Sequence, residues 1–161
     1  MPATVSNPRD LFLVALSEIL FVERMLSFEV LPELQKQVHD PDLGRALAEH
    51  LEETKRHVEN VEAAFRAVGA EPSSAHSPPF VGLKDHHSQL AGNTKDDRLA
   101  DVLHAHAAAA TEHYEIASYR TLVALARELG VDDARKALES NLSDEEGALK
   151  ALEKALGSLT G

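Results

Sequence analysis

Apolar residues recur along most of the chain at spacings of three and four, which is the period of an amphipathic helix. These residues form four rows, each of which predicts one helix. Two rows begin with clear helix-start signals, because Asn7-Pro8 and Asp40-Pro41 each pair an N-cap residue with proline at the first helical position. Two rows end at Gly69 and Gly130, a residue type common just past a helix. The pattern predicts an all-α chain whose helices span about 8–38, 41–68, 95–129 and 132–158.

The segment between the second and third rows, residues 69–94, is rich in Pro, Ser and Gly. We expect a long crossover that can hold a short extra helix around residues 81–90. Such a crossover lets the third helix start at the other end of the molecule, so the chain would form two antiparallel hairpins. Asn93 or Thr94 is the expected N-cap of the third helix. Pro32 is expected to kink the first helix or weaken its last turns.

Glutamates occupy positions in these apolar rows where leucine is expected. Glu23 does so in the first row and Glu145 in the fourth. On the third helix Glu112 and Glu115 are three residues apart, on the face that continues through Tyr119. An unpaired buried carboxylate costs several kcal/mol. Each of these residues must therefore stay protonated, find a partner or hold a metal ion.

The second helix carries a polar row beside its apolar one. His50, Glu53 and His57 fall within an arc of about 60° on that helix. Glu23 lies about 16 residues before the first interhelical turn and Glu53 about 12 after it, or roughly 24 and 18 Å along the axes. On the third and fourth helices, Glu115 lies about 16 residues before the second interhelical turn and Glu145 about 14 after it, so their depths also agree. We therefore expect the carboxylates of all four helices at one depth.

Carboxylates that converge in a dry core repel one another, and divalent cations would neutralise them. Di-iron and di-manganese bundles use Glu from two helices and Glu-x-x-His from the other two. This chain matches the Glu-x-x-His motif only in part. On the second helix the order of the two residues is reversed, as His50-x-x-Glu53, and on the third helix Glu115 stands where the motif has histidine. The sequence predicts two divalent metal ions, iron or manganese, with these candidate metal-binding residues: Glu23, His50, Glu53, Glu112, Glu115 and Glu145. His50 fits either a ligand or a supporting hydrogen-bond partner, and His57 is expected not to be a direct ligand.

Composition narrows the classes of function. The 161 residues suit one domain, 1–161, and contain no Cys, which excludes disulfides and thiolate metal sites. A metal ion would be held by oxygen and imidazole ligands. The net charge of −11 without a basic cluster argues against binding nucleic acid. No apolar stretch is long enough to span a membrane, and the first residues, MPATVSNP, do not read as a signal peptide. We expect a cytoplasmic protein.

Several segments resemble the YciE/YciF-type stress-protein family of the ferritin-like superfamily. The most specific is Glu112-His113-Tyr114-Glu115-Ile116-Ala117-Ser118-Tyr119, which is followed by Thr121–Ala126 and Leu129-Gly130. Shorter matches are Val22-Glu23-Arg24, Glu49–Thr54 and Asp144-Glu145-Glu146. The resemblance covers nearly the whole chain.

This resemblance implies a ferritin-like four-helix bundle, often dimeric, with a dinuclear metal site and a loosely defined role in stress response. The implied ligands are Glu23, Glu53, Glu112 and Glu145, with His50 and Glu115 near them. The chain departs from the family at His57, where glutamine is common, and at Gly82–His87, which lacks the usual short charged helix. The first departure bears on metal preference and the second on dimer contacts.

Three functions remain open on the sequence. The metal centre would activate oxygen or peroxide, or it would buffer iron without catalysis. Alternatively, the chain is a structural or interaction protein whose metal site is degenerate. A homodimer is expected in each case. The remaining histidines, His86, His87, His104 and His106, are interpreted as ordinary exposed side chains.

Overall fold

A computed structural model describes residues 4–161; the first three residues of the N-terminal segment considered above lie outside the described part. The prediction of an all-α chain is confirmed, since every regular element of residues 4–161 is helical. The elements are α1 Pro8–Met25, η1 Leu26–Val30, α2 Leu31–Gln37, α3 Pro41–Ala67, α4 Pro78–Gly92, α5 Asp97–Glu128 and α6 Asp132–Thr160.

The first helical row is one rod interrupted by a wider turn. Asn7 caps α1 by accepting the Asp10 N–H, as its sequence predicts. At η1 the hydrogen bonds lengthen to a π pattern, in which the Leu31 N–H bonds to the Leu26 carbonyl. Pro32 follows at the start of α2, and it has no N–H with which to continue the regular α-helical ladder. The chain thus accommodates the proline by a π turn rather than by ending the helix.

The crossover contains more helix than the sequence indicates. α4 begins at Pro78, where two prolines fit a first turn that needs no N–H donors, and it covers 15 residues. Phe80 anchors it with 1% of its surface exposed. The expected N-cap of the third helix is wrong, because Asp96 caps α5 by accepting the Leu99 N–H at 2.8 Å.

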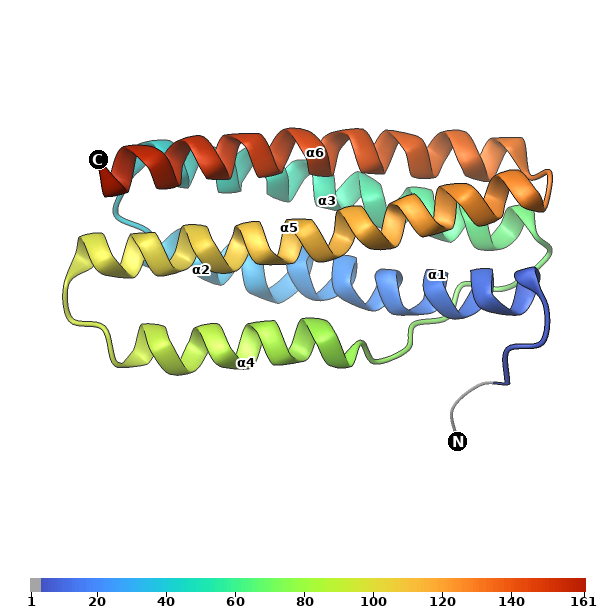
Figure 1. Ribbon diagram of the computed structural model, residues 1–161, viewed down its shortest axis with the longest axis horizontal. Coiled ribbons are helices and arrows are strands. Elements are labelled where there is room, and N and C mark those ends of the chain that lie inside the picture. Colours follow the sequence, from blue (N-terminus) through green and yellow to red (C-terminus); the bar gives the residue numbers. More distant parts are fainter. Residues whose placement is uncertain (1–3) are drawn as a thin grey trace.

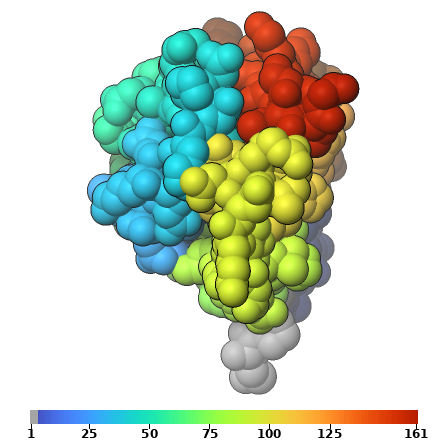
Figure 2. Space-filling model, turned by 90° about the vertical axis from the view of Figure 1, so that its left-hand side faces the viewer, coloured from blue at the N-terminus to red at the C-terminus, as the bar shows by residue number. Residues whose placement is uncertain are grey.

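The long helices lie side by side along the molecule (Figure 1). α1 contacts α3 and α5, α6 contacts the same two helices, and α4 packs on the outside against α5. Figure 2 looks onto the end where the α2–α3 connection, the start of α5 and the C-terminus meet. Within residues 4–161 no helix is both long and apolar enough to cross a membrane.

A buried aspartate holds the α2–α3 connection. Asp101, 2% exposed, accepts the backbone N–H groups of His39 at 3.0 Å and Asp40 at 2.7 Å. We expect Asp101→Ala to lower the free energy of unfolding by about 3 kcal/mol, because it removes two hydrogen bonds to a charged acceptor. Urea denaturation of the metal-free protein measures this. Asp97→Ala on the same helix should cost under about 1 kcal/mol, and equal losses in the two variants would contradict the assignment.

Candidate metal centre

Glutamates and histidines from α1, α3, α5 and α6 meet in the middle of the molecule. Glu23 of α1, His57 of α3, Glu115 of α5 and Glu145 of α6 are each 0% exposed. The helical periods put these side chains on the inward faces of their helices, where the neighbouring positions are apolar. The centre is therefore built from segments that are distant in sequence.

Four of the residues form a first group of donors. One ligand atom from each of His50, Glu112, Glu115 and Glu145 can be chosen so that all lie within 4.8 Å of one another. His50 Nε2 is 3.1 Å from Glu112 Oε1 and 3.6 Å from Glu145 Oε2. Three carboxylates and one imidazole are a suitable donor set for a divalent first-row metal ion.

A second group lies beside the first and shares one residue with it. Glu23, His57 and Glu145 bring their donor atoms within 4.8 Å of one another. His57 Nδ1 is 2.9 Å from Glu145 Oε1 and 3.3 Å from Glu23 Oε1. The two oxygens of Glu145 thus face different histidines, His57 and His50. This is the arrangement of a carboxylate placed to bridge two metal positions.

The buried polar atoms of the centre are not satisfied by the protein. Eight buried side-chain oxygen and nitrogen atoms among the described residues make no hydrogen bond, and all eight belong to the two donor groups. Four of them, namely His50 Nε2, His57 Nδ1 and the two oxygens of Glu145, have only the ion-pair contacts given above. Both oxygens of Glu115 have neither a hydrogen bond nor an ion-pair contact with any described residue. Buried polar atoms normally find partners, because an unsatisfied one costs about 1–3 kcal/mol and more for a charge. The residues present therefore fit bound cations, which would give these atoms their missing partners.

Burial and mutual repulsion shift the pKa values of the acids upward. Burial, with the charge of Glu112, raises the pKa of Glu145 to about 8. Burial, with the charges of Glu145, Glu23 and Glu112, raises the pKa of Glu115 well above its ordinary value. In the metal-free protein both shifts favour the protonated form of the acid.

The pKa values of the two histidines are raised, although burial by itself would lower them. Burial alone would lower the pKa of His57, but the carboxylates of Glu23 and Glu145 raise it to about 10. Burial likewise opposes the charged form of His50, and the neighbouring Glu112 raises its pKa well above the ordinary value. Protons thus balance part of the negative charge that a metal ion would neutralise.

Glu53 does not join either donor group. Its side chain is 29% exposed, and it faces the other ring nitrogen of the first histidine, with 3.3 Å between His50 Nδ1 and Glu53 Oε2. The hydrogen bond with His50 lowers the pKa of Glu53. A carboxylate in this position orients the imidazole and increases its basicity toward a metal ion.

Polar residues that are not among the predicted ligands hold the second group in place. The Tyr119 hydroxyl donates to Glu23 and accepts from Asn141 Nδ2 at 3.0 Å. His57 Nε2 lies 3.2 Å from Asp144 Oδ2, a carboxylate at the edge of the centre with 29% of its side chain exposed. Asp144 thus connects the buried imidazole with solvent.

The role of His57 could have been suspected from its spacing. It follows His50 by seven residues, two full helical turns, so both imidazoles leave one face of α3. Asn141 precedes Glu145 by one turn in the same way. No comparable signal marks Asp144, which stands next to a buried position and reaches the centre only through the packing of α3 against α6.

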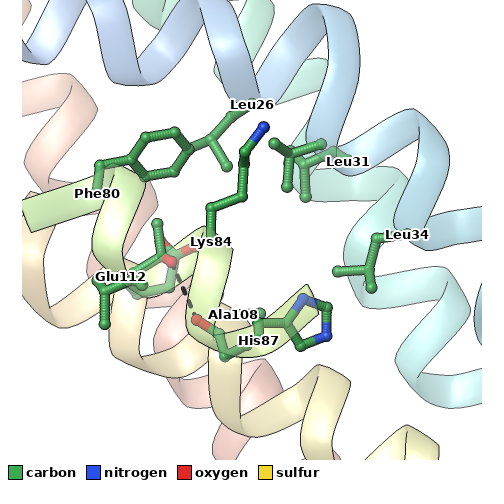
Figure 3. A pocket seen from close by; sticks show the side chains of 12 residues that line it. Leu26, Leu31, Leu34, Phe80, Lys84, His87, Ala108 and Glu112 are labelled. Carbon is green, nitrogen blue, oxygen red and sulfur yellow. Dashed lines mark hydrogen bonds between the residues drawn. The ribbon is translucent and has the colours of Figure 1, made fainter. Parts of the chain in front are cut away.

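An apolar pocket of about 40 Å³ reaches the first group from the side of α4. In Figure 3 the side chains of Leu26, Leu31 and Leu34 face Phe80 and Lys84 of α4, with Glu112 deeper in the wall. The ion pair between Lys84 Nζ and Glu29 Oε1, at 2.8 Å, joins α4 to η1 near this pocket.

Comparison with known proteins identifies the family of this chain. The family model DUF892, described as a domain of unknown function, matches residues 7–161. The chain belongs to the DUF892 family. Its relatives include the protein YciF of Escherichia coli K12, 30% identical over 137 residues, which are 84% of this chain and 82% of YciF. The resemblance to the YciE/YciF-type family is therefore confirmed.

Solved structures of similar proteins have the same fold as this DUF892 chain. The crystal structure of the E. coli stress protein YciF matches with a TM-score of 0.91 at 27% identity, over 97% of this chain and 98% of that one. YcfI of Rhodopseudomonas palustris, for which a structural role has been suggested, matches with a TM-score of 0.90 at 35% identity, over 95% and 97% of the two chains.

Proposed function

We propose that the chain is a single ferritin-like four-helix domain whose two donor groups hold a dinuclear metal centre, of iron or manganese. The observation that carries this proposal is the set of eight buried atoms of the two donor groups that make no hydrogen bond. Glu145 would bridge the two ions, His50 and His57 would each bind one, and Glu53 would support His50. A homodimer stays a prediction of the family resemblance, and a cytoplasmic location stays a prediction of the composition and the first residues.

A redox-active metal pair would supply electrons to dioxygen or peroxide in turnover. In the buffering alternative, the centre would bind iron without such turnover. The protein's own part is to hold and move protons. Asp144 can take up a proton that leaves His57 Nε2, because the two atoms are 3.2 Å apart and Asp144 reaches solvent. The apolar pocket beside Glu112 offers a small uncharged oxidant a route that excludes bulk water.

Elemental analysis of protein expressed with supplements of iron and manganese tests the centre. The expected result is close to two transition-metal ions per chain. Purified protein that contains almost none and takes up none on reconstitution would reject the proposal. Added peroxide then separates catalysis from buffering, because buffering gives metal binding without peroxide-dependent turnover.

Metal uptake should strengthen as pH rises. Glu145, with its pKa raised to about 8, and His57, with its pKa raised to about 10, must lose protons before they can bind metal. Each displaced proton makes the apparent affinity rise by about tenfold per pH unit below the relevant pKa. Calorimetric titration with Mn²⁺ between about pH 6 and 8, in buffers of different ionisation enthalpy, measures both affinity and proton release. An affinity that does not change with pH would contradict the protonation states given above.

A second candidate is a structural protein with a degenerate site. The structural role suggested for YcfI favours it, and the raised pKa values of Glu115 and Glu145 would let the acids remain buried as neutral carboxyls. Such a protein would gain no thermal stability from added iron or manganese.

A further inference from the structure

Three histidines from separate segments line one pocket. His39 comes from the α2–α3 connection, His87 from α4 and His104 from α5. Together with Asp97 they line a pocket of about 410 Å³. Of the described residues that line it, none is Lys or Arg, so no fixed positive charge opposes a cation there. These residues are separate from the two donor groups of the candidate metal centre.

Two of these histidines are hydrogen-bonded to each other. His87 Nε2 is 2.8 Å from His104 Nδ1, and the ring centroids are 5.1 Å apart at an interplanar angle of 69°. Two imidazole nitrogens on one tetrahedral Zn²⁺ ion lie about 3.3 Å apart, given Zn–N bonds of about 2.0–2.1 Å. To admit the metal ion, the hydrogen bond must break and release its proton, and the rings must turn and separate by about half an ångström, within the rotamer freedom of two side chains.

Both histidines are prepared to act as neutral ligands. His104 is 3% exposed and His87 is half-buried. Burial lowers the pKa of each, and the charge of the other imidazole lowers the pKa of His87 further. Near neutral pH both rings then keep a lone pair, which is the form that binds metal.

The third histidine is held at the rim. The backbone of His39 is fixed by its N–H bond to buried Asp101, while its side chain remains 56% exposed. Its Nε2 lies 3.7 Å from Asp97 Oδ1 and its Nδ1 lies 3.7 Å from Asp101 Oδ1. The imidazole would have to rotate about its side-chain torsions, away from these carboxylates, to reach His87 and His104.

We propose that His87, His104 and His39 form a mononuclear site for Zn²⁺ or Cu²⁺, with Asp97 or water in the fourth position. This nitrogen-rich set differs from the carboxylate-rich centre between the helices and selects borderline metals rather than manganese. Bound metal would tie α4 and the α2–α3 connection to α5. It would thereby brace the helix that covers the apolar pocket beside Glu112, where His87 also contributes to the wall (Figure 3).

The test compares Zn²⁺ titrations of the full chain and four single variants. His87→Ala should bind one Zn²⁺ ion fewer than the unmodified protein. His39→Ala should bind it roughly tenfold or more weakly, since losing a ligand costs at least as much as losing an outer partner of a ligand. His86→Ala and His106→Ala are the matched controls, because both histidines are exposed neighbours on the same two helices, and they should keep the full stoichiometry.

Cu²⁺ electron paramagnetic resonance supplies an independent readout, since the signal with imidazole nitrogen splitting should be weaker by one Cu²⁺ site in His87→Ala than in the unmodified protein. The comparison does not depend on the dinuclear centre, because the count is the difference between two chains that both retain it. The proposal is overturned if His87→Ala binds as much Zn²⁺ as the unmodified chain. It is equally overturned if the control variants lose as much as His87→Ala does.

Discussion

Glu145→Gln is expected to remove both metal ions, whereas Glu146→Gln should retain both. Glu145 belongs to both donor groups and turns one oxygen toward each histidine. Glutamine keeps the shape of the side chain but lacks the charge and the second oxygen ligand. The neighbouring glutamate is a matched control, because Glu146 is only partly buried and pairs with Arg120 at 2.8 Å.

Single-group variants sharpen this prediction. Glu23→Gln should lose the ion of the second group and keep the other, because Glu23 belongs to that group alone. Metal analysis after reconstitution would then give about two ions for Glu146→Gln, one for Glu23→Gln and none for Glu145→Gln. The loss in Glu145→Gln should also remove about 3 kcal/mol of metal-dependent stabilisation for each ion at a hundredfold excess over Kd, or roughly 5–10 °C in Tm per ion for a chain of this size. Equal metal contents in Glu145→Gln and Glu146→Gln would refute the bridging role.

Glu115→Leu should raise the stability of the metal-free protein and reduce its response to metal. Glu115 is 0% exposed and neither carboxylate oxygen has a partner. Replacing buried charged groups with an apolar side chain of similar volume stabilises proteins by about 1–4 kcal/mol in known cases. Differential scanning calorimetry of chelator-treated protein should show Tm higher by several degrees.

The calorimetry experiment also needs a control variant and a second measurement with added metal. Glu128→Leu, on the exposed end of the same helix, should leave Tm nearly unchanged. With metal added, the unmodified protein should gain stability and Glu115→Leu should gain less, because one ligand of the first group is missing. A metal-free Glu115→Leu protein that melts below the unmodified one would show that the carboxyl is satisfied in a way the contacts above do not include. If the unmodified protein gains nothing from metal, the structural candidate is favoured instead.

The sequence by itself determined the helices and the inward-facing acids. Helical periodicity, N-caps and terminal glycines are local properties, so the helices expected over 41–68 and 132–158 agree closely with α3 and α6. Glu23 and Glu145 stood out because a charged residue in a leucine position is unfavourable whatever the partner helix. The π turn before Pro32 and the full length of α4 were not determined in this way, because both depend on how the backbone adjusts to its neighbours.

Tertiary structure decided which side chains of α3 enter the centre and which remain at its edge. Glu53 and His57 belong to the same polar row, yet His57 is buried between Glu23 and Glu145 while Glu53 stays partly exposed behind His50. The rotation of α3 about its own axis makes this difference, and contacts with α1 and α6 set that rotation. The pairing of His87 with His104 has the same origin, because nothing in the local sequence of α4 indicates which residue of α5 it will meet. A helix encodes its own faces, and only packing decides what each face touches.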